Sequence, residues 1–330
     1  MRRLAVRAER WPIAGAFTIS RGSKTAAEVV VAEVTDGDGR VGRGECVPYA
    51  RYGETVAAVM AALEALAGAV ADGLDRAGLA ARLPAGAARN ALDCALWDLE
   101  ARQARQPVWR LAGLPRPAAV ETAETLSLDT AEAMAAKAVT VAGRLIKLKV
   151  GSDGVLERVA AVHAAAPGAR LIVDANEAWT LEQVAAWLPA LAGLGVALVE
   201  QPLPAGADAG LAVLGPPAVP LCADESVHTA AGLEDLAGRY QVVNIKLDKT
   251  GGLTGALALR QRAEALGFGI MVGCMVGTSL GMAPALLVAQ GAAFVDLDGP
   301  LMLTTDRPDG LRYTGGWVEP PAPLLWGGGI

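Results

Sequence analysis

The chain has 330 residues, a length that suits one large α/β barrel with an appendage or two separate domains. Hydrophobic residues make up 53% of it and charged residues 19%, which excludes a mainly disordered chain, and the net charge of −6 argues against binding through nucleic-acid phosphates. Because we find neither a long uninterrupted apolar stretch nor the apolar core of a signal peptide, we expect a cytoplasmic protein that does not enter a membrane.

The first part of the chain is typical of a small α+β domain. Residues 28–34 and 40–46 read as two strands, and the Asp-Gly-Asp-Gly turn at 36–39 suits a hairpin between them. Two helical stretches follow near 54–71 and 86–104, and the second carries an apolar face at helical spacing. A proline-rich break at 114–117 ends this part, so we expect a first domain at 1–115.

The rest of the chain repeats a short apolar run that ends in a polar residue, followed by an Ala/Leu-rich helical segment. After a weaker first run at 120–126, the clear ones are 145–149, 171–174, 197–200, 221–224, 242–246, 270–274 and 294–298. Their last residues are 22 to 28 positions apart, enough for a strand, a loop and a helix. Eight such units predict a closed (β/α)8-type barrel over 116–305. We expect the remaining segment, 306–330, to pack back on the first domain.

Three acids end successive strands of this barrel: Asp174, Glu200 and Asp224. The carboxyl ends of barrel strands carry the functional side chains, so the three carboxylates converge, where they repel one another strongly. A hard divalent cation removes that conflict, and ligation by oxygen alone points to Mg²⁺. Zinc is excluded by the four scattered cysteines and the two histidines.

Three lysines lie at strand ends of the same barrel. Lys147 and Lys149 alternate with apolar residues on strand two, so both face the interior, and Lys246 ends strand six. Strands two and six are opposite each other in a ring of eight. The arrangement puts one potential base on each side of a bound substrate, because a nearby cation and partial burial can lower the pKa of a lysine.

Asp296 and Asp298 lie on strand eight, which is across the ring from Glu200. Ionised carboxylates only accept hydrogen bonds, so the pair suits an α-ammonium group at the far end of a short ligand.

The motifs that carry these residues resemble those of a known family. They are KLK, VDANEAW, VEQPLP, CADES, NIKLDKTGGL and FVDLDGPLML, with GECVPYARYGE and PAGAARNALDCALWDLEAR in the first domain. Together they resemble the enolase superfamily in its muconate-lactonising subgroup, and within it the L-Ala-D/L-Glu (dipeptide) epimerases. The resemblance implies a modified, enolase-like barrel with an N-terminal α+β capping domain, and a role in peptidoglycan-peptide metabolism.

The resemblance also implies a mechanism. Mg²⁺ on the three acids would hold the C-terminal carboxylate of a small dipeptide, and the strand-eight aspartates would grip its ammonium group. Lys149 and Lys246 would exchange the α-proton on opposite faces, and Lys147 would help to stabilise the enolate-like intermediate.

Four further residues complete the expected substrate site. Thr125 and Cys274 lie where family members contact the dipeptide backbone. A lid loop at about 15–25 would close over the substrate, and a cation on it would pair with the glutamate side chain. Arg21 and Lys24 are the candidates, and we favour Lys24, although lysine lacks the bidentate geometry of arginine.

The residues leave other readings open. A cycloisomerase or an o-succinylbenzoate-synthase-like lyase could use the same framework, but those substrates lack the ammonium group that Asp296 and Asp298 suit. A non-catalytic barrel that binds a ligand is a more remote alternative, because buried unpaired charges are costly without a function. The preferred dipeptide and the possible assembly of a homo-oligomer are not determined by the sequence.

Overall fold

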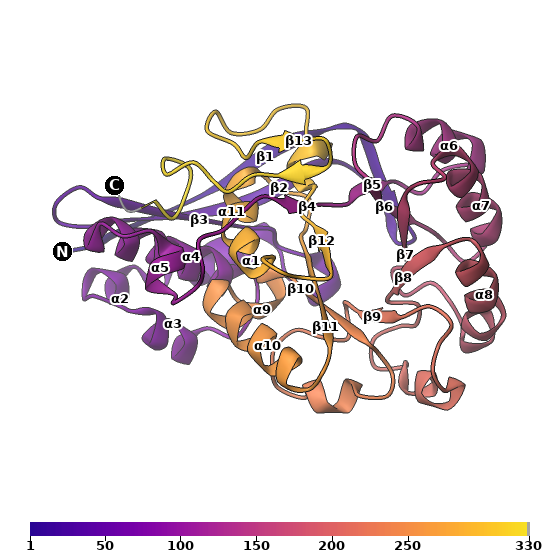
Figure 1. The fold of residues 1–330 in the computed structure, drawn as a ribbon. Coiled ribbons are helices and arrows are strands. Elements are labelled where there is room, and N and C mark those ends of the chain that lie inside the picture. The colour runs from indigo at the N-terminus through magenta and orange to yellow at the C-terminus, as the bar shows by residue number, and fades with distance from the viewer. Residues whose placement is uncertain (329–330) are drawn as a thin grey trace.

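The computed structural model describes residues 1–328, which form a parallel β-barrel beside a smaller capping domain (Figure 1). The expected architecture, a nearly closed eight-stranded barrel with an N-terminal α+β cap, is therefore confirmed. Within residues 1–328 we find no helix that combines the length and the apolar character needed to span a bilayer.

The capping domain is built on an antiparallel sheet of β1 (Arg3–Ile19), β2 (Gly22–Thr35) and β3 (Val41–Cys46). The predicted turn joins β2 to β3, with Gly39 at a φ of 80° and the Asp36 carboxylate accepting bonds from two backbone amides of the turn. Two predictions were incomplete. The first strand was missed, and the expected lid loop at 15–25 is instead the tip of the long β1–β2 hairpin.

Five helices complete the cap: α1 (Val56–Glu64), α2 (Ala67–Ala71), α3 (Arg76–Arg82), α4 (Ala87–Ala104) and α5 (Val108–Leu111). The helix predicted at 54–71 is thus two helices with a break at 65–66, and α3 was not predicted. The α4 helix lies close against β3, because Gly42 and Gly44 leave room for its backbone.

The barrel sheet runs in chain order, all strands parallel, which requires a crossover between each pair. Its strands are β5 (Glu124–Leu126), β6 (Leu145–Lys149), β7 (Arg170–Asp174), β8 (Val196–Glu200), β9 (Leu221–Ala223), β10 (Val242–Ile245), β11 (Gly269–Gly273) and β12 (Phe294–Asp296). The ring is closed by local bonds rather than by a full ladder: the amide of Ala123 donates to the Val295 carbonyl at 2.8 Å, and the Leu297 amide donates to Thr122 Oγ1 at 2.9 Å.

The crossovers are less regular than the expected alternation of strand and helix. The helices are α6 (Ala131–Ala138), α7 (Val155–Ala165), α8 (Leu181–Gly193), α9 (Leu247–Thr250), α10 (Leu253–Ala265) and α11 (Ser279–Val288). Two crossovers have only short 3₁₀ turns, η2 (Ala209–Leu214) and η3 (Leu233–Leu236). In the first of them, prolines at 202, 204, 216, 217 and 220 leave only residues 205–215 for a helix, and three glycines in that stretch disfavour an α-helix. In the second, η3 is bracketed by two glycines with positive φ, Gly232 and Gly238.

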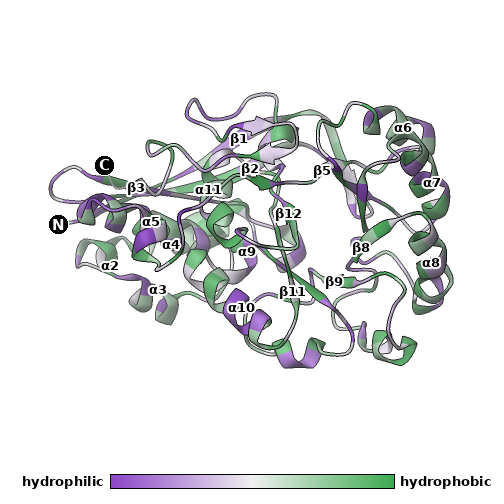
Figure 2. Cartoon of the chain, viewed as in Figure 1, coloured by the Kyte–Doolittle hydropathy of each residue, from purple (hydrophilic) through white to green (hydrophobic). Residues whose placement is uncertain are grey.

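Apolar side chains fill both sides of the barrel strands. A compact inner layer includes Leu145, Ile172 and Leu198, whereas Ile146 and Leu148 belong to the larger core between the strands and the outer helices. Strands β8 and β11 are accordingly green in Figure 2, while purple residues gather on outer helices such as α10. The inner layer forms a buried apolar floor beneath the carboxyl ends of the strands.

The segment after the barrel returns to the cap. β13 (Tyr313–Thr314) and β14 (Trp317–Val318) pair with β4 (Val120–Glu121). Further on, the indole of Trp326 donates to the Cys94 carbonyl of α4 at 3.1 Å, and Arg43 on β3 donates to the carbonyls of Leu324 and Leu325. These contacts join the end of the described chain to the capping domain.

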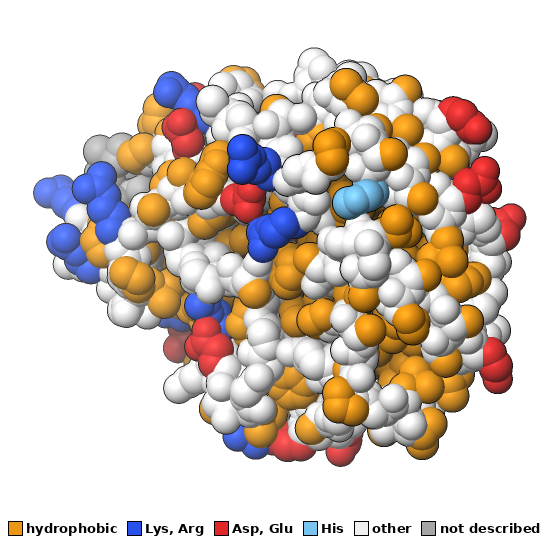
Figure 3. All heavy atoms as spheres, turned by 45° about the vertical axis from the view of Figure 1, so that its right-hand side comes forward, with side chains coloured by type: hydrophobic (Ala, Val, Ile, Leu, Met, Phe, Trp, Pro, Cys, Tyr) orange, Lys and Arg blue, Asp and Glu red, His pale blue; other side chains and the backbone are white. Residues whose placement is uncertain are grey.

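Most charged side chains of the face in Figure 3 lie toward its edges. Lys and Arg side chains gather at the left, Asp and Glu lie along the right edge, and a small mixed group of basic and acidic side chains lies left of the centre. This face therefore has no continuous basic stripe of the kind that binds nucleic-acid phosphates.

The close approach of β3 and α4 predicts a specific sensitivity. A Cβ on Gly44 would lie 2.1 Å from the Ala91 carbonyl oxygen and 2.8 Å from the Ala95 nitrogen, so Gly44→Ala must push the helix off the strand. We expect a loss of about 2 kcal/mol in the free energy of unfolding, measured by urea denaturation. Gly68→Ala is the control, because nothing lies within 4 Å of its Cβ position. Equal stability of the two variants would contradict the packing argument.

Candidate functional site

A cavity of about 1050 Å³ lies between the tip of the β1–β2 hairpin, the segment that follows β3, and the carboxyl ends of the barrel strands. Its volume is at the upper end of the range for small-molecule sites. Nine of the predicted site residues line it: Arg21, Lys24, Thr125, Lys149, Asp224, Lys246, Cys274, Asp296 and Asp298. Both Thr125 and Cys274 are half-buried in its wall. The other three, Lys147, Asp174 and Glu200, lie behind this surface and are fully buried.

The three predicted metal ligands end neighbouring strands, as their spacing indicated. Asp174 on β7 is in register with Glu200 on β8, and Asp224 directly follows β9. All three are at most 2% exposed. Carboxylates this deep require opposite charge close by, and the lysines of the site provide part of it.

Lys147 lies at the centre of the buried charges. Its Nζ is 3.0 Å from Asp174 Oδ2, 2.8 Å from Glu200 Oε2 and 2.7 Å from Asp296 Oδ2. It therefore connects the predicted metal ligands to the strand-eight pair. Burial opposes its charge, but the three carboxylates raise the pKa of Lys147 well above its usual value.

Lys149 and Lys246 reach the cavity from opposite strands of the ring, β6 and the end of β10. The Nζ of Lys149 is 2.6 Å from Asp174 Oδ2, and that of Lys246 is 2.6 Å from Asp224 Oδ2. Burial alone would lower the pKa of Lys246, but Asp224 and Glu200 raise it well above the usual value. The lowered pKa expected from the sequence is thus not found while the lysine has this carboxylate partner.

The acids fit a cation by the chemistry of their oxygen atoms. Burial and the charge of Asp174 raise the pKa of Glu200 to about 7, although Lys147 Nζ lies 2.8 Å from its Oε2. The lysine ammonium therefore offsets only part of the negative charge at this carboxylate. Over the same described range, no three acid, histidine or cysteine side chains are already arranged as ligands, because the lysine ammonium groups stand between the carboxylates.

The strand-eight aspartates form the opposite wall. Asp298 Oδ2 accepts a bond from the Thr125 amide at 2.6 Å, and the Thr125 hydroxyl donates to Asp296 at 3.4 Å. Burial and the neighbouring Asp296 raise the pKa of Asp298 to about 7. A cationic group in the cavity would stabilise the ionised form of this carboxyl.

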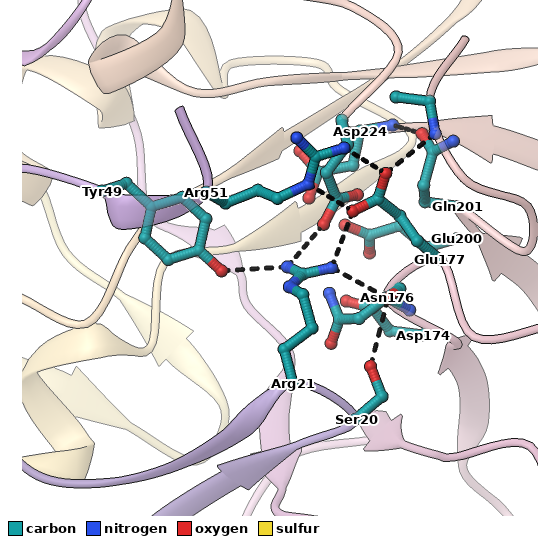
Figure 4. Close-up of polar contacts among 12 residues, drawn as sticks. Ser20, Arg21, Tyr49, Arg51, Asp174, Asn176, Glu177, Glu200, Gln201 and Asp224 are labelled. Atoms are coloured by element: carbon teal, nitrogen blue, oxygen red, sulfur yellow. Dashed lines mark hydrogen bonds and ion pairs between the residues drawn. The ribbon is translucent and has the colours of Figure 1, made fainter. Parts of the chain in front are cut away.

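The two lid cations lie differently. Arg21, at the hairpin tip, points toward Glu177 and the Tyr49 hydroxyl (Figure 4), and its Nη2 also donates to Glu225. Lys24 is exposed, and its Nζ is 5.2 Å from the centre of the Tyr49 ring. Only Lys24 leaves its charged group free of a carboxylate partner in the described chain.

Several buried residues of the site were not predicted. Lys249 donates to the side chain and the carbonyl of Asp224, Asn244 donates to Glu200 at 2.8 Å, and the Gln201 side chain joins the loops after β8 and β9. Alternation along β10 could have found Asn244, because it faces inward two positions before Lys246. Nothing in the local pattern distinguishes Lys249 from a solvated helix lysine.

Comparison with known proteins agrees with this geometry. Residues 1–113 match the N-terminal domain of the mandelate racemase / muconate lactonizing enzyme family, and residues 129–323 match the enolase C-terminal domain-like family. An L-Ala-D/L-Glu epimerase of Escherichia coli is 49% identical over 96% of this chain and 99% of its own length. An N-acetyl-D-glutamate racemase of a Pseudoalteromonas species is 47% identical over 87% of this chain and 91% of its own.

Solved structures extend the match to the whole fold. An enolase family member from Agrobacterium tumefaciens with homology to dipeptide epimerases, bound to sodium and L-Ala-L-Glu, is 52% identical with a TM-score of 0.96 over 99% of this chain and all of that one. A dipeptide epimerase from Enterococcus faecalis in complex with Mg and L-Leu-L-Tyr is 30% identical with a TM-score of 0.90, over 99% and 98% of the two chains. The chain belongs to the enolase superfamily, in its mandelate racemase / muconate lactonizing enzyme branch.

Proposed function

We propose that the protein is a dipeptide epimerase that inverts the α-carbon of the second residue of L-Ala-Glu or a related L-Ala-Xaa dipeptide. The observation that carries this proposal is the pair Lys149 and Lys246, which face one cavity from opposite strands of the ring. Inversion requires a proton to leave one face of the carbon and another to arrive on the opposite face. Two separate bases meet that requirement.

In this mechanism one lysine, as the neutral amine, takes the α-proton and becomes an ammonium group. The other, as the ammonium group, returns a proton to the opposite face, so the charges balance over one turnover. Lys147, with its raised pKa, remains positive and stabilises the negative charge that develops on the carboxylate of the substrate. The roles of the lysines are interchanged when the opposite isomer reacts.

The acids Asp174, Glu200 and Asp224 would hold Mg²⁺. When bound, the ion would supply positive charge for the substrate carboxylate and increase the acidity of the α-carbon. Asp174 and Asp224, which pair with Lys149 and Lys246 in this structure, would then share their negative charge with the ion, so the main cause of the raised pKa of Lys246 would be weakened. The lysine is then a better base near neutral pH.

Asp296 and Asp298 would bind the ammonium group of the dipeptide, with Thr125 and Cys274 beside its backbone. The Pseudoalteromonas relative is named for a substrate whose nitrogen is acetylated, so a second candidate is racemisation of N-acyl glutamate. The two candidates differ in the charge at the strand-eight wall. Lys24 would pair with the glutamate side chain in both cases.

The two-base mechanism predicts distinct defects in the lysine variants. Lys149→Ala and Lys246→Ala should each abolish net epimerisation, because one face of the α-carbon loses its acid or base. Each variant should still exchange the α-proton of one isomer for deuterium, the opposite isomer in each case. Proton NMR of L-Ala-L-Glu and L-Ala-D-Glu in D₂O measures both effects. Normal epimerisation by either variant would rule out the assignment of that lysine.

The metal assignment predicts stabilisation by Mg²⁺. Because ligands that bind the folded state raise the melting temperature, millimolar Mg²⁺ should raise the Tm of the chelator-treated wild type. Glu200→Gln keeps the size of the side chain and removes one charge, so its Tm should respond far less. An unchanged response in the variant, or full activity of the wild type after complete chelation, would contradict the site.

The strand-eight pair predicts discrimination by charge. N-propionyl-glutamate is L-Ala-Glu without its amino group, so the wild type should turn it over much more slowly. Asp298→Asn should lower kcat/KM for L-Ala-Glu, and the loss should correspond to about 2–4 kcal/mol of transition-state stabilisation. The same substitution should affect kcat/KM for the propionyl compound much less. Equal turnover of both compounds by the wild type would favour the N-acyl candidate and reopen the cycloisomerase and lyase alternatives.

A further inference from the structure

Arg21 makes more polar contacts than any other lid side chain described. Its Nη1 donates to the Asn176 carbonyl at 2.8 Å and to Glu177 at 3.0 Å, and its Nη2 donates to the Tyr49 hydroxyl at 2.9 Å and to Glu225 at 2.7 Å. The four N–H bonds of the two terminal nitrogens are therefore all used. The guanidinium is in consequence unable to offer a bidentate face to a substrate carboxylate.

Three barrel residues, Asn176, Glu177 and Glu225, form the receptor for this arginine. Asn176 and Glu177, which follow β7, have φ values of 44° and 70°, a backbone region that favours glycine. This conformation points the Asn176 carbonyl at the lid, where Ser20 and Arg21 both donate to it (Figure 4). Strained backbone of this kind persists where the surrounding structure and the function require it.

Glu225, which lies in the loop after β9, completes the receptor. Its side chain is 2% exposed, it directly follows Asp224, and its Oε2 has no hydrogen-bond partner within residues 1–328. The lid supplies the opposite charge for this carboxylate, because Arg21 Nη2 lies 2.7 Å from Glu225 Oε1. A buried carboxylate beside other acids gains more from such a partner than an exposed one does.

The hairpin tip has few other attachments. The pairing of β1 with β2 is interrupted between Pro12 and Phe17, so the distal ladder is separated from the rest of the sheet. Beyond Arg21, the tip is joined to the barrel by the Ser20 hydroxyl, by the Leu128 amide, which donates to the Thr18 carbonyl at 3.0 Å, and by the Ser127 hydroxyl, which donates to the Ala16 carbonyl at 3.5 Å. The strongest contacts of the tip are thus those of one side chain.

We propose that Arg21 is a positioning residue that latches the lid hairpin onto Asn176, Glu177 and Glu225, and that it does not contact the substrate side chain. This inference rests on the proposed function, because the latch closes the site in which the dipeptide reacts. Phe17 and Lys24 are partners in the hairpin ladder, and Lys149 Nζ lies 5.9 Å from the centre of the Phe17 ring. Latching at Arg21 therefore places the catalytic lysine under an apolar cover and Lys24 at the cavity wall.

The kinetic test compares two dipeptides of the same shape, L-Ala-L-Glu and its neutral counterpart L-Ala-L-Gln. Arg21→Met should lower kcat/KM by the same factor for both, about tenfold, since a lost latch affects every substrate. Lys24→Met should lower it for the glutamate dipeptide only. A loss in Arg21→Met that is selective for glutamate, or no loss at all, would overturn the proposal.

A second measurement does not depend on turnover. Hydrogen exchange followed by mass spectrometry should show faster exchange over residues 17–25 in Arg21→Met, with the rest of the chain unchanged. Glu225→Gln should do the same, and the double variant should exchange no faster than either single one, because both changes break one contact. Arg51→Met is the matched control: Arg51 also pairs with Glu177 at 2.7 Å, but it lies outside the hairpin.

The two measurements separate the two proposals. If the wild type turned over neither dipeptide but Arg21→Met still loosened the hairpin, the latch would stand and the proposed function would fail. Unchanged exchange over residues 17–25 in Arg21→Met, or an equal increase in Arg51→Met, would refute the latch whatever the activity.

Discussion

The site depends on the burial of several carboxylates at one end of the barrel. Asp174, Glu200 and Asp224 are at most 2% exposed, and such groups are stable only when opposite charge lies within a few ångströms. Lysines from inside the same ring supply it: Lys147 from β6 contacts Asp174 and Glu200, and Lys246 after β10 contacts Asp224. Because attraction and repulsion are both strong here, small changes in charge redistribute the protons. That sensitivity suits a centre where a cation and a carboxylate substrate bind and a proton moves.

The capping domain contacts the barrel in two regions: several polar pairs away from the cavity, and a few contacts of the hairpin tip at the cavity. Away from the cavity, polar pairs hold it to the barrel: Asn90 on α4 donates to Asp248 at 2.8 Å, and the Thr278 amide donates to Glu45 at 2.8 Å. At the cavity, the hairpin tip rests mainly on Arg21. A fixed base with a lightly held tip allows the hairpin to admit a substrate without separation of the domains.

Much of the fold was predictable because hydrophobic periodicity reports directly on which face of an element is buried. The apolar runs identified all eight barrel strands, although only the second half of the first run, β5, belongs to the barrel, and the polar residue that ends each of the other seven runs lies at the cavity end of the barrel. The regular helices expected after β8 and β9 are 3₁₀ turns, since prolines and left-handed glycines interrupt them. The strand β1 was missed because it is half-exposed along most of its length and alternates weakly, so its pairing with β2, not its own pattern, makes it a strand.

The sequence alone determined the type of chemistry, because the identity and spacing of Lys147, Lys149 and the strand-end acids on a parallel barrel leave few arrangements open. The tertiary structure decided which charges are partners. The raised pKa of Lys246 follows from the position of Asp224 Oδ2 at 2.6 Å, and no spacing along the chain specifies such a distance. Arg21 and Lys24 are equivalent cations in the sequence, three residues apart on one hairpin. Only the fold, which brings Asn176 and Glu225 to one of them, separates their environments, because contacts between residues 155 and 204 positions apart are set by packing rather than by local pattern.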